Sequence, residues 1–551
     1  MKAKIKIPLL IVLFIGIAVY AYFGATGSIS SNYAYRSVLK DSAPAAGEQL
    51  GAAATQKVVI VLIDGLRYDT SLDTSVMPFL NDLRANGASA KMHSQAPSYS
   101  EPGYSTILTG AWPEINDGPA LNLDYEEIPT FTQDNLFSAA HDAGFTTAIS
   151  AYYWFEKLVP QTAVDNSFYT PGDDAQADSD VINAAMPWLQ NPNVQLVLVH
   201  IDQVDYAGHH QGGPQSENWN MAAKRADDLL LQVVNQLDLE TDTVVVLSDH
   251  GHIMIGGHGG QDPDVLVEPF VIAGAGAKNG ATGEINMVDV APTLAALLGA
   301  RLPASTQGIV RSELVELSAS AQTALPAAVT KQQAALVSAY TTALGTPVEG
   351  ASLALGDDVA AYQALMSKAH DARLWPQRVL RAVPAAVLLA VGITLLIRKR
   401  KNGAMSWVIG ALVYVALFTL RYAVLSKKTF SLSSVTGQMD LILYTATTAA
   451  AAFLIAYLLN ILLNKLLSRR PAEAVLNTFG LGFTVVFALM IPVALSFVLN
   501  GAVVTWTLPD YFTSFLSLLA LIQILIVCAV ALLFGGISAL LTLKNRKNVA
   551  K

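Results

Sequence analysis

Six long apolar segments constrain this sequence of 551 residues more than any other feature. One lies near the N-terminus, at residues 8–23. Five more follow towards the C-terminus, with spans expected near 379–397, 405–425, 439–463, 475–499 and 513–542. Each of these five is long enough for a helix to cross a hydrocarbon core of about 30 Å. The sequence therefore predicts a multi-pass protein of the cell membrane, with one N-terminal and about five C-terminal transmembrane helices.

The N-terminal apolar segment follows the basic stretch "MKAKIKI" and fits either a signal peptide or an uncleaved anchor. We favour an anchor over residues 1–29, because the small residues after the apolar run contain no convincing cleavage site. The stretch "ATG" keeps a cleaved signal peptide open as the alternative.

Basic clusters between the apolar segments predict the orientation of the chain. With six crossings, four clusters fall on one side: "MKAKIK", "RKRK" at 398–401, "NKLLSRR" at 464–470 and "LKNRKNVAK" at the C-terminus. The positive-inside rule makes that side cytoplasmic. The dissenting cluster is "SKK" at 426–428. Residues 24–375 are then expected outside the cytoplasm.

The expected external segment is strongly acidic. Residues 24–375 hold 15 Lys and Arg against 40 Asp and Glu, a formal charge of −25. This charge argues against a nucleic-acid partner. It fits a solvated surface, and it could also supply metal ligands. The sole cysteine, Cys528, lies in the last apolar segment, so the external segment has no internal disulfide and must be held by its core or by metals.

Buried strands alternating with helices predict an α/β fold in the external segment. Three runs of aliphatic residues end in Asp or His: "KVVIVLIDG" at 57–65, "VQLVLVHID" at 194–202 and "TVVVLSDHG" at 243–251. Helical stretches such as 217–237 and 290–299 separate strands of this kind. The pattern predicts a parallel sheet with helices on both faces, which collects ligands at the carboxyl ends of its strands.

The domain organisation follows from these features. Residues 30–56 are rich in Ala, Gly and Ser and are expected to be a linker. The folded α/β domain is expected over 57–315, a helical connector over 316–378, and the membrane bundle over 379–551.

Carboxylate and imidazole donors cluster near the ends of the predicted strands. The candidate ligands are Asp64, Asp205, His209, Asp249, His250 and His258. This ligand set suits Zn²⁺ or Mn²⁺. One Asp-His pair at a strand end is more often structural than catalytic. Donors at three strand ends indicate metal binding, because burying so many ionisable groups without a cation is costly.

The stretch "SQAPSYSEPGYSTILTG" at 94–110 places hydroxyls just before an expected helix. Pro102 in the first turn puts Ser100 near the helix N-terminus, where peptide N–H groups stabilise negative charge. Ser98 or Ser100 could simply cap the helix. With a divalent cation nearby, a serine hydroxyl can instead lose its proton and attack phosphorus.

Five motifs in order carry a resemblance to a known family. They are "VLIDGLRYD", "PSYSEPGYSTILTGAWPE", "DQVDYAGHHQGG", "SDHGHIMIGGHGG" and "VDVAPTLAALLGARLPASTQG". Together they resemble the alkaline phosphatase superfamily, in its type I phosphodiesterase/nucleotide pyrophosphatase branch. The chain is also similar to the membrane-bound ethanolamine phosphate transferases of glycolipid-anchor synthesis. The resemblance covers about residues 57–310 and implies an alkaline-phosphatase-like fold.

The resemblance also implies roles for the candidate residues. One of two divalent metal ions would be held by Asp64, Ser100, Asp249 and His250, and the other by Asp205, His209 and His258. Ser100 would be the nucleophile and form a covalent phospho-serine. The expected substrate is a phosphate ester that could be lipid-linked.

Three positions depart from patterns of the superfamily. The branch commonly has Thr where this chain has Ser100, which preserves the hydroxyl. Gly103 stands where an Asn that contacts the phosphoryl oxygen is expected, so the phosphate clamp is unidentified and a nucleotide pyrophosphatase is less favoured. The arginine of the sulfatase motif C/S-x-P-x-R is missing from "SYSEPGY", which argues against a sulfatase.

Other polar and aromatic residues have simpler interpretations. We interpret His200, inside the strand "LVLVHID", as a packed core histidine, and His210 as facing solvent or substrate. His252 could contact substrate, but we do not favour that interpretation. The aromatic run at 152–155 could line a cleft or pack at the edge of an element.

Three functional classes remain open on the sequence. The favoured one is a metal-dependent phosphodiesterase or phospho-alcohol transferase at the extracytoplasmic face. A catalytically silent scaffold is less favoured, because every donor is retained. A lipid-handling or transport function of the membrane segments is also less favoured, because those segments contain few charges.

Overall fold

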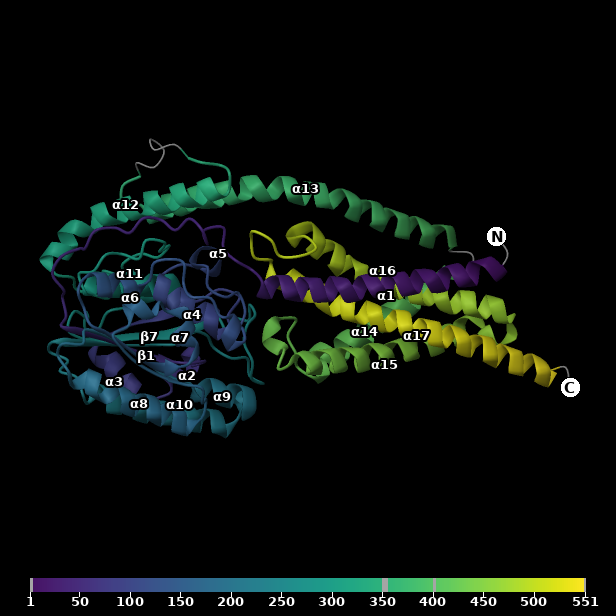
Figure 1. The fold of residues 1–551 in the computed structure, drawn as a ribbon. Helices are drawn as coiled ribbons and strands as arrows, with labels where there is room; N and C mark the ends of the chain where they lie inside the picture. The colour runs from purple at the N-terminus through teal and green to yellow at the C-terminus, as the bar shows by residue number, and fades with distance from the viewer. Residues whose placement is uncertain (1–2, 349–354, 400–402, 550–551) are drawn as a thin grey trace. The chain divides into compact units, whose positions relative to one another are not determined.

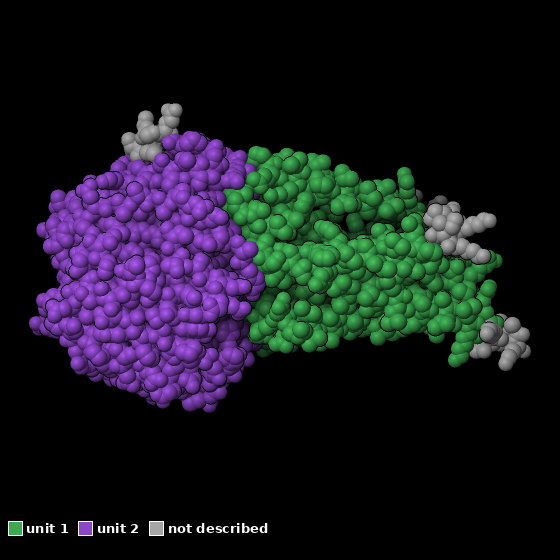
Figure 2. Space-filling model, viewed as in Figure 1, with its two compact units in different colours: residues 1–32, 375–551 green, residues 33–374 purple. Residues whose placement is uncertain are grey.

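The computed structural model describes residues 3–348, 355–399 and 403–549. These residues form two compact units, coloured separately in Figure 2: residues 33–374, and residues 1–32 together with 375–551. The first unit carries all of the sheet, and the second consists of long apolar helices.

The unit of residues 33–374 is built on one eight-stranded sheet with the order β4-β3-β5-β1-β6-β7-β2-β8. The strands are β1 (Lys57–Ile63), β2 (Ala88–His93), β3 (Thr147–Tyr152), β4 (Asn166–Thr170), β5 (Leu196–Ile201), β6 (Asp242–Leu247), β7 (Val267–Gly274) and β8 (Thr282–Asn286). All three strands expected from the sequence are present as β1, β5 and β6. They are adjacent and parallel at the centre of the sheet.

Helices cover both faces of the sheet, as Figure 1 shows. The helices of this unit are α2 (Tyr68–Leu72), α3 (Pro78–Asn86), α4 (Ser100–Thr109), α5 (Pro113–Asn116), α6 (Leu136–Asp142), α7 (Trp154–Leu158), α8 (Ala175–Gln190), α9 (Gln203–His210), α10 (Glu217–Val234), α11 (Val290–Leu297) and α12 (Ala319–Ala343). Alternate residues of β1 enter different cores, since successive strand side chains point to opposite faces. Ile60 packs in the core with α4, α6 and α11, and Val61 packs in the core with α3, α8 and α10. The expected α/β architecture is confirmed.

The sheet is mixed rather than wholly parallel, because β7 runs antiparallel to both β6 and β2. A parallel return from β6 would need a crossover connection, usually a helix. Residues 248–266, all of which the structure describes, contain no helix, so the chain turns back directly into β7. This irregular loop carries three of the histidines discussed below.

Within its described residues, the second unit contains six helices long and apolar enough to cross a membrane, which confirms the number expected from the sequence. They are α1 (Ala3–Tyr33), the apolar part of α13 (Val359–Lys399), α14 (Ala404–Thr419) with the π-helical turn Leu420–Leu425, α15 (Gln438–Asn464), α16 (Pro471–Asn500) and α17 (Tyr511–Val549). Their shared core includes Phe14, Tyr414, Phe453 and Phe479. Arg421 lies in the π-helical turn, and its guanidinium stands 5.2 Å from the ring centre of Tyr444.

Candidate functional site

The candidate site forms where the three central strands end. Asp64 directly follows β1, Asp205 lies in the first turn of α9 after β5, and Asp249 and His250 lie just after β6. Because the carboxyl ends of parallel strands meet at one edge of a sheet, the loops after these strands converge. The fold therefore brings together donors that are 185 residues apart in the sequence, from position 64 to position 249.

The first group of donors converges on the His250 ring. His250 Nε2 lies 3.3 Å from Asp64 Oδ1, 3.3 Å from Asp249 Oδ2 and 3.2 Å from Ser100 Oγ. All four residues are buried. Asp64 Oδ1 and Asp249 Oδ2 have no hydrogen-bond partner among the described residues. Two unpartnered carboxylate oxygens beside one imidazole nitrogen are what a cation site requires.

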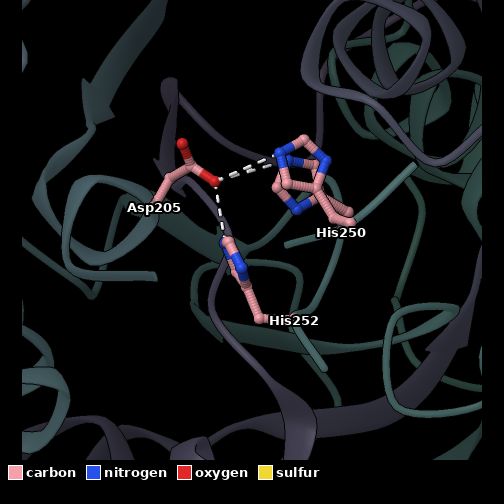
Figure 3. A group of neighbouring side chains, drawn as sticks. Asp205, His250 and His252 are labelled. Carbon is pink, nitrogen blue, oxygen red and sulfur yellow. Dashed lines mark hydrogen bonds and ion pairs between the residues drawn. The ribbon is translucent and has the colours of Figure 1, made fainter. Parts of the chain in front are cut away.

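The second group of donors lies beside the first. Asp205 Oδ1 is 3.5 Å from both His209 Nε2 and His258 Nε2, and these two nitrogens are 2.8 Å apart. The His250 and His258 rings stack with centroids 3.7 Å apart, and His250 Nε2 is 3.9 Å from Asp205 Oδ1. Figure 3 shows one Asp205 oxygen facing His250. The structure thus brings together all seven site residues predicted from the sequence.

Backbone carbonyls orient two of these histidines. His250 Nδ1–H donates to the Gly251 carbonyl at 3.2 Å, and His258 Nδ1–H donates to the Ser98 carbonyl at 3.0 Å. A carbonyl only accepts hydrogen bonds, so Nδ1 carries the proton and Nε2 presents its lone pair. Metal-binding histidines are typically held in this way by their second nitrogen.

The buried carboxylates of the site shift one another's pKa values. Burial, then the nearby charges of Asp64 and Asp205, raise the pKa of Asp249 well above its ordinary value. Burial and the charges of the same two neighbours also raise the pKa of Asp202 well above its ordinary value. Burial opposes ionisation of Asp205 too, but His209, His252 and His258 hold its pKa well below the usual range. The cluster carries more negative charge than its own side chains neutralise.

Ser100 is the first residue of α4, and Tyr99 occupies the N-cap. No cap hydrogen bond is made by the Tyr99 side chain, and the Ser100 hydroxyl faces His250 instead. Ser98 is also buried, but its Oγ donates to the Gly260 carbonyl at 2.8 Å and accepts the Gly259 N–H. Ser98 therefore holds the loop before β7, whereas the Ser100 hydroxyl is directed towards the donors.

Gly103 lets the first turn of α4 approach Asp249. A Cβ at position 103 would stand 2.8 Å from Asp249 Cβ and 3.0 Å from the Asp249 carbonyl oxygen. An asparagine side chain has no room at this position. The departure noted at Gly103 therefore reflects tight packing between the helix and the loop after β6.

Asn122 is a residue of the site that the sequence reasoning missed. Its Oδ1 accepts the N–H of Glu101, the peptide that follows Ser100, at 3.0 Å. Glu101 is buried, its Oε1 accepts the Leu123 N–H at 3.0 Å, and burial raises its pKa to about 8. The carboxamide of Asn122 is thus fixed beside the candidate nucleophile. No sequence motif that we recognised pointed to it.

His252 was also missed as a member of the cluster. Its Nδ1 accepts the Gly257 N–H at 2.9 Å, so Nε2 carries the proton and donates to Asp205 Oδ1 at 2.8 Å. Figure 3 shows His252 directed at the same Asp205 oxygen that faces His250. Burial lowers the pKa of His252 to about 4, which keeps the ring neutral. The available signal was its place two residues after His250 in one loop.

His200 is buried in the sheet as expected, but it also contacts the site. Its Nε2 lies 3.0 Å from Asp64 Oδ2, and the Tyr104 hydroxyl donates to the same oxygen. The interpretation of His200 as a core histidine alone was therefore incomplete. Its side chain and that of Tyr104 hold one Asp64 oxygen, so the other faces His250.

The remaining candidates lie elsewhere. His210 is exposed and contacts the rings of Tyr206 and His209 rather than the donor atoms. Tyr152 ends β3 and Phe155 is fully buried in α7, so the aromatic run spans the end of a strand and the start of a helix.

Residues 58–258 match the family described as type I phosphodiesterase / nucleotide pyrophosphatase. This match confirms, for that segment, the resemblance expected from the motifs.

The curated relatives include GPI ethanolamine phosphate transferase 2 of Candida albicans, 24% identical over 49% of this chain and 33% of its own length. The catalytic subunit of human GPI ethanolamine phosphate transferase 2 is 27% identical over 47% of this chain and 28% of its own length. The aligned region thus spans about a third of these relatives.

Among solved structures, human ectonucleotide pyrophosphatase / phosphodiesterase 5 covers 44% of this chain and 95% of its own, with 15% identity and a TM-score of 0.37. The phosphonate monoester hydrolase of Silicibacter pomeroyi covers 46% and 75%, with 15% identity and a TM-score of 0.33.

Proposed function

We propose that this protein is a membrane-bound, divalent-metal-dependent enzyme that transfers a phospho-alcohol group, of the phosphoethanolamine type, or hydrolyses a phosphodiester. One observation carries the proposal: the Ser100 hydroxyl lies 3.2 Å from His250 Nε2, at the first turn of a helix. Beside it are two carboxylate oxygens, Asp64 Oδ1 and Asp249 Oδ2, that have no hydrogen-bond partner among the residues that the structure describes. This arrangement suits nucleophilic attack on phosphorus.

The donors fit two divalent cations, Zn²⁺ or Mn²⁺. Asp64, Ser100, Asp249 and His250 would hold one, and a second set would hold the other: Asp205, His209 and His258. Donor atoms of Asp64, Asp249 and His250 lie within 4.8 Å of one another. In the second set, Asp205 Oδ1 lies 3.5 Å from both His209 Nε2 and His258 Nε2. When bound, such cations lower the pKa of a coordinated hydroxyl and offset charge on a phosphoryl group.

The protein's own residues then perform the transfer. Ser100 Oγ forms a bond to phosphorus while the bond from phosphorus to the first alcohol breaks, and the departing oxygen takes up a proton. A second alcohol, or water, next attacks the phospho-serine and restores the hydroxyl. Asn122 is placed to hold a phosphoryl oxygen through its Nδ2, because its Oδ1 is already fixed to the Glu101 N–H. Asn122 is our candidate for the phosphate clamp.

The names of the relatives support ethanolamine phosphate as the transferred group. The bilayer surrounding the apolar helices makes a lipid-linked donor or acceptor accessible to the chain. A nucleotide phosphodiester is the second candidate substrate, and the description of the matching family favours it.

The decisive experiment uses the purified full chain in lipid nanodiscs with a phosphatidylethanolamine labelled in its head group. We expect label on Ser100, detected by peptide mass spectrometry, and its release to an added alcohol or to water. Ser100→Ala should abolish both, Ser100→Thr should retain them, and Ser98→Ala is the matched control for a hydroxyl outside the donor group.

Three results would count against parts of this proposal. Near-normal turnover by Ser100→Ala would remove the nucleophile from position 100. Hydrolysis of a nucleotide diester, but not of the lipid, would favour the second substrate class. A protein without divalent metal and without activity on either substrate would leave the scaffold interpretation.

We further propose that residues 57–315 form the catalytic domain and lie on the extracytoplasmic side. Support comes from the acidic charge of this segment and the basic clusters that flank the apolar helices. Reporter fusions after Ser468 and Ser433 test this orientation. We expect the first to be cytoplasmic and the second external, and the opposite pattern would refute it.

A further inference from the structure

A cavity of about 660 Å³ lies within the helical unit, among α1, α13, α14 and α16. Its size falls in the range of about 300–1,000 Å³ that is usual for small-molecule sites. Most of its wall is apolar and includes Leu9, Leu395, Leu476, Phe483 and Phe487. Leu9 and Leu395 are more than half exposed, so the cavity is open rather than sealed.

Positive charge gathers at one end of this cavity. Lys6 from α1, Lys399 from the end of α13 and Arg469 before α16 all line it, against the single acid Glu473. Among the described residues, none of the three cations takes part in an ion pair. Arg469 Nε donates to the Asn464 carbonyl at 2.9 Å, which holds its side chain in place.

Close helix packing shapes the walls of the cavity. A Cβ at Gly392 would stand 2.1 Å from the Phe487 ring, and one at Gly480 would stand 2.3 Å from the Trp407 ring. These glycines let both aromatic rings lie directly on neighbouring helix backbones. Trp407 lines the cavity, and its buried Nε1–H has no hydrogen-bond partner in the described part of the chain.

A buried polar network supports the wall formed by α16. Asn477 lines the cavity, and its Oδ1 accepts Asn460 Nδ2 at 2.9 Å. Asn464 Nδ2 in turn donates to Asn460 Oδ1 at 2.8 Å and to Ser406 Oγ at 2.6 Å. Such bonds between apolar helices fix their relative positions, so the cavity has a rigid wall.

The residues that line the cavity include none of the candidate active-site residues. Lys6 precedes Tyr33, where the unit containing the sheet begins, by 27 residues of continuous helix. At 1.5 Å per residue this distance is roughly 40 Å, about the thickness of a whole bilayer. If α1 spans a bilayer, its two ends would therefore lie at opposite membrane surfaces, with Lys6 and the basic end of the cavity at one of them.

We propose that this cavity binds an anionic glycerophospholipid, with an acyl chain against the leucine and phenylalanine wall and the phosphate among Lys6, Lys399 and Arg469. An apolar wall alone would accept any lipid. Three cations against one acid at the rim select a negatively charged head group, since basic residues at a membrane surface attract anionic lipids.

The test is native mass spectrometry of the full chain, released from detergent that contains equal amounts of phosphatidylglycerol and phosphatidylcholine with identical acyl chains. We expect one phosphatidylglycerol to be retained in preference to phosphatidylcholine. Arg469→Gln should lower its apparent affinity about fivefold, the effect of about one basic residue near a membrane surface. Arg470→Gln is the matched control, because Arg470 neighbours Arg469 but does not line the cavity.

A second pair of variants tests the apolar wall without changing charge. Leu395→Trp should fill the cavity and displace the lipid. Leu388→Trp should not, because Leu388 lies seven residues earlier on α13, is exposed and lies outside the cavity. Helix content and elution volume show that each variant is folded. If Arg469→Gln instead distorts the end of α15, Lys6→Gln with Lys399→Gln provides the same test of charge.

Several outcomes would overturn the proposal. Equal retention of phosphatidylcholine would show an apolar groove without head-group selection. An equal loss with Arg470→Gln would show a diffuse surface charge effect. Unchanged lipid retention in Leu395→Trp would place the lipid elsewhere. If wild type instead forms a dimer without bound lipid and Leu395→Trp loses that dimer, a second copy of the chain fills the cavity.

Discussion

Replacing His252 with asparagine should weaken metal binding by the second group of donors while leaving the loop folded. His252 makes two hydrogen bonds, from Nε2–H to Asp205 Oδ1 and from the Gly257 N–H to Nδ1. An asparagine carboxamide oxygen reaches about where Nδ1 stands, but the shorter side chain cannot reach Asp205. The variant therefore keeps the bond to the loop and loses the bond to the carboxylate.

The size of the effect follows from the lost bond. A hydrogen bond to a charged group contributes about 1.5–3 kcal/mol. Outer partners of metal ligands typically change metal affinity by about 10–100-fold. Asp205 Oδ1 is 3.5 Å from both His209 Nε2 and His258 Nε2, so a rotation of its carboxylate moves the oxygen that faces both nitrogens. We expect a 10–100-fold loss of affinity at this group of donors.

Competition with a chromophoric zinc chelator measures the affinity, and thermal unfolding of the metal-free protein measures the fold. His210→Asn is the matched control, because His210 is exposed and lies outside the donor cluster. Wild-type affinity in His252→Asn would refute the orienting role. So would a fall in the metal-free melting temperature as large as the loss of metal binding, since it would indicate a collapsed loop.

Two further substitutions test the packing and the charge of the domain. Gly103→Ala should cost about 1–3 kcal/mol of stability and lower activity, because its Cβ would stand 2.8 Å from Asp249 Cβ. Gly283→Ala is the control for thermal unfolding, because the nearest atom to its new Cβ is at 3.9 Å. Equal melting temperatures of the two variants would contradict this reasoning. Burial raises the pKa of Glu268, whose Oε1 accepts a hydrogen bond from the Ser94 hydroxyl. The proton bound to Glu268 stabilises the fold fully below the pKa of this group in the unfolded chain, and the stabilisation is lost as pH rises through its raised pKa in the folded protein. The melting temperature of wild type should therefore fall relative to Glu268→Gln between pH 5 and pH 8, and parallel curves in scanning fluorimetry would show that Glu268 ionises normally.

The sequence predicted the central strands well because each is a continuous apolar run that ends abruptly in a polar residue. Burial on both faces of a parallel sheet produces such runs. Asp64 and Asp249 were found for the same reason, since they follow the ends of β1 and β6. The six apolar helices could be predicted equally well from the sequence, because their length and composition alone define them.

The supporting residues of the site could not be found in this way. His200 is indistinguishable in sequence from a core residue, and its contact with Asp64 depends on the pairing of β1 with β5. Asn122 lies in an irregular loop that approaches Glu101 only in the folded chain. The direction of β7 was also missed, because the loop before it has the composition of a ligand loop and gives no sign of where the chain turns back.

Metal removal should destabilise the protein, and more strongly at high pH. Burial and the neighbouring charges of Asp64 and Asp205 raise the pKa of Asp249, so the metal-free fold is stabilised when this carboxyl is protonated. That stabilisation is complete below the unfolded pKa of about 3.9 and is lost as pH rises through the folded value.

Bound cations would compensate the same charges, and protons compete with metal for the donors. A cation present at a thousandfold excess over its Kd would add about 4 kcal/mol of stability. The fall in melting temperature on adding chelator should therefore be larger at pH 8 than at pH 5, and Zn²⁺ or Mn²⁺ should reverse it. Asp249→Asn should reduce the difference between the two pH values, because it removes a carboxyl group whose ionisation at higher pH destabilises the metal-free fold. A melting temperature indifferent to chelator at both pH values would mean that the donors are stabilised without metal, and the proposed two-metal site would then be wrong.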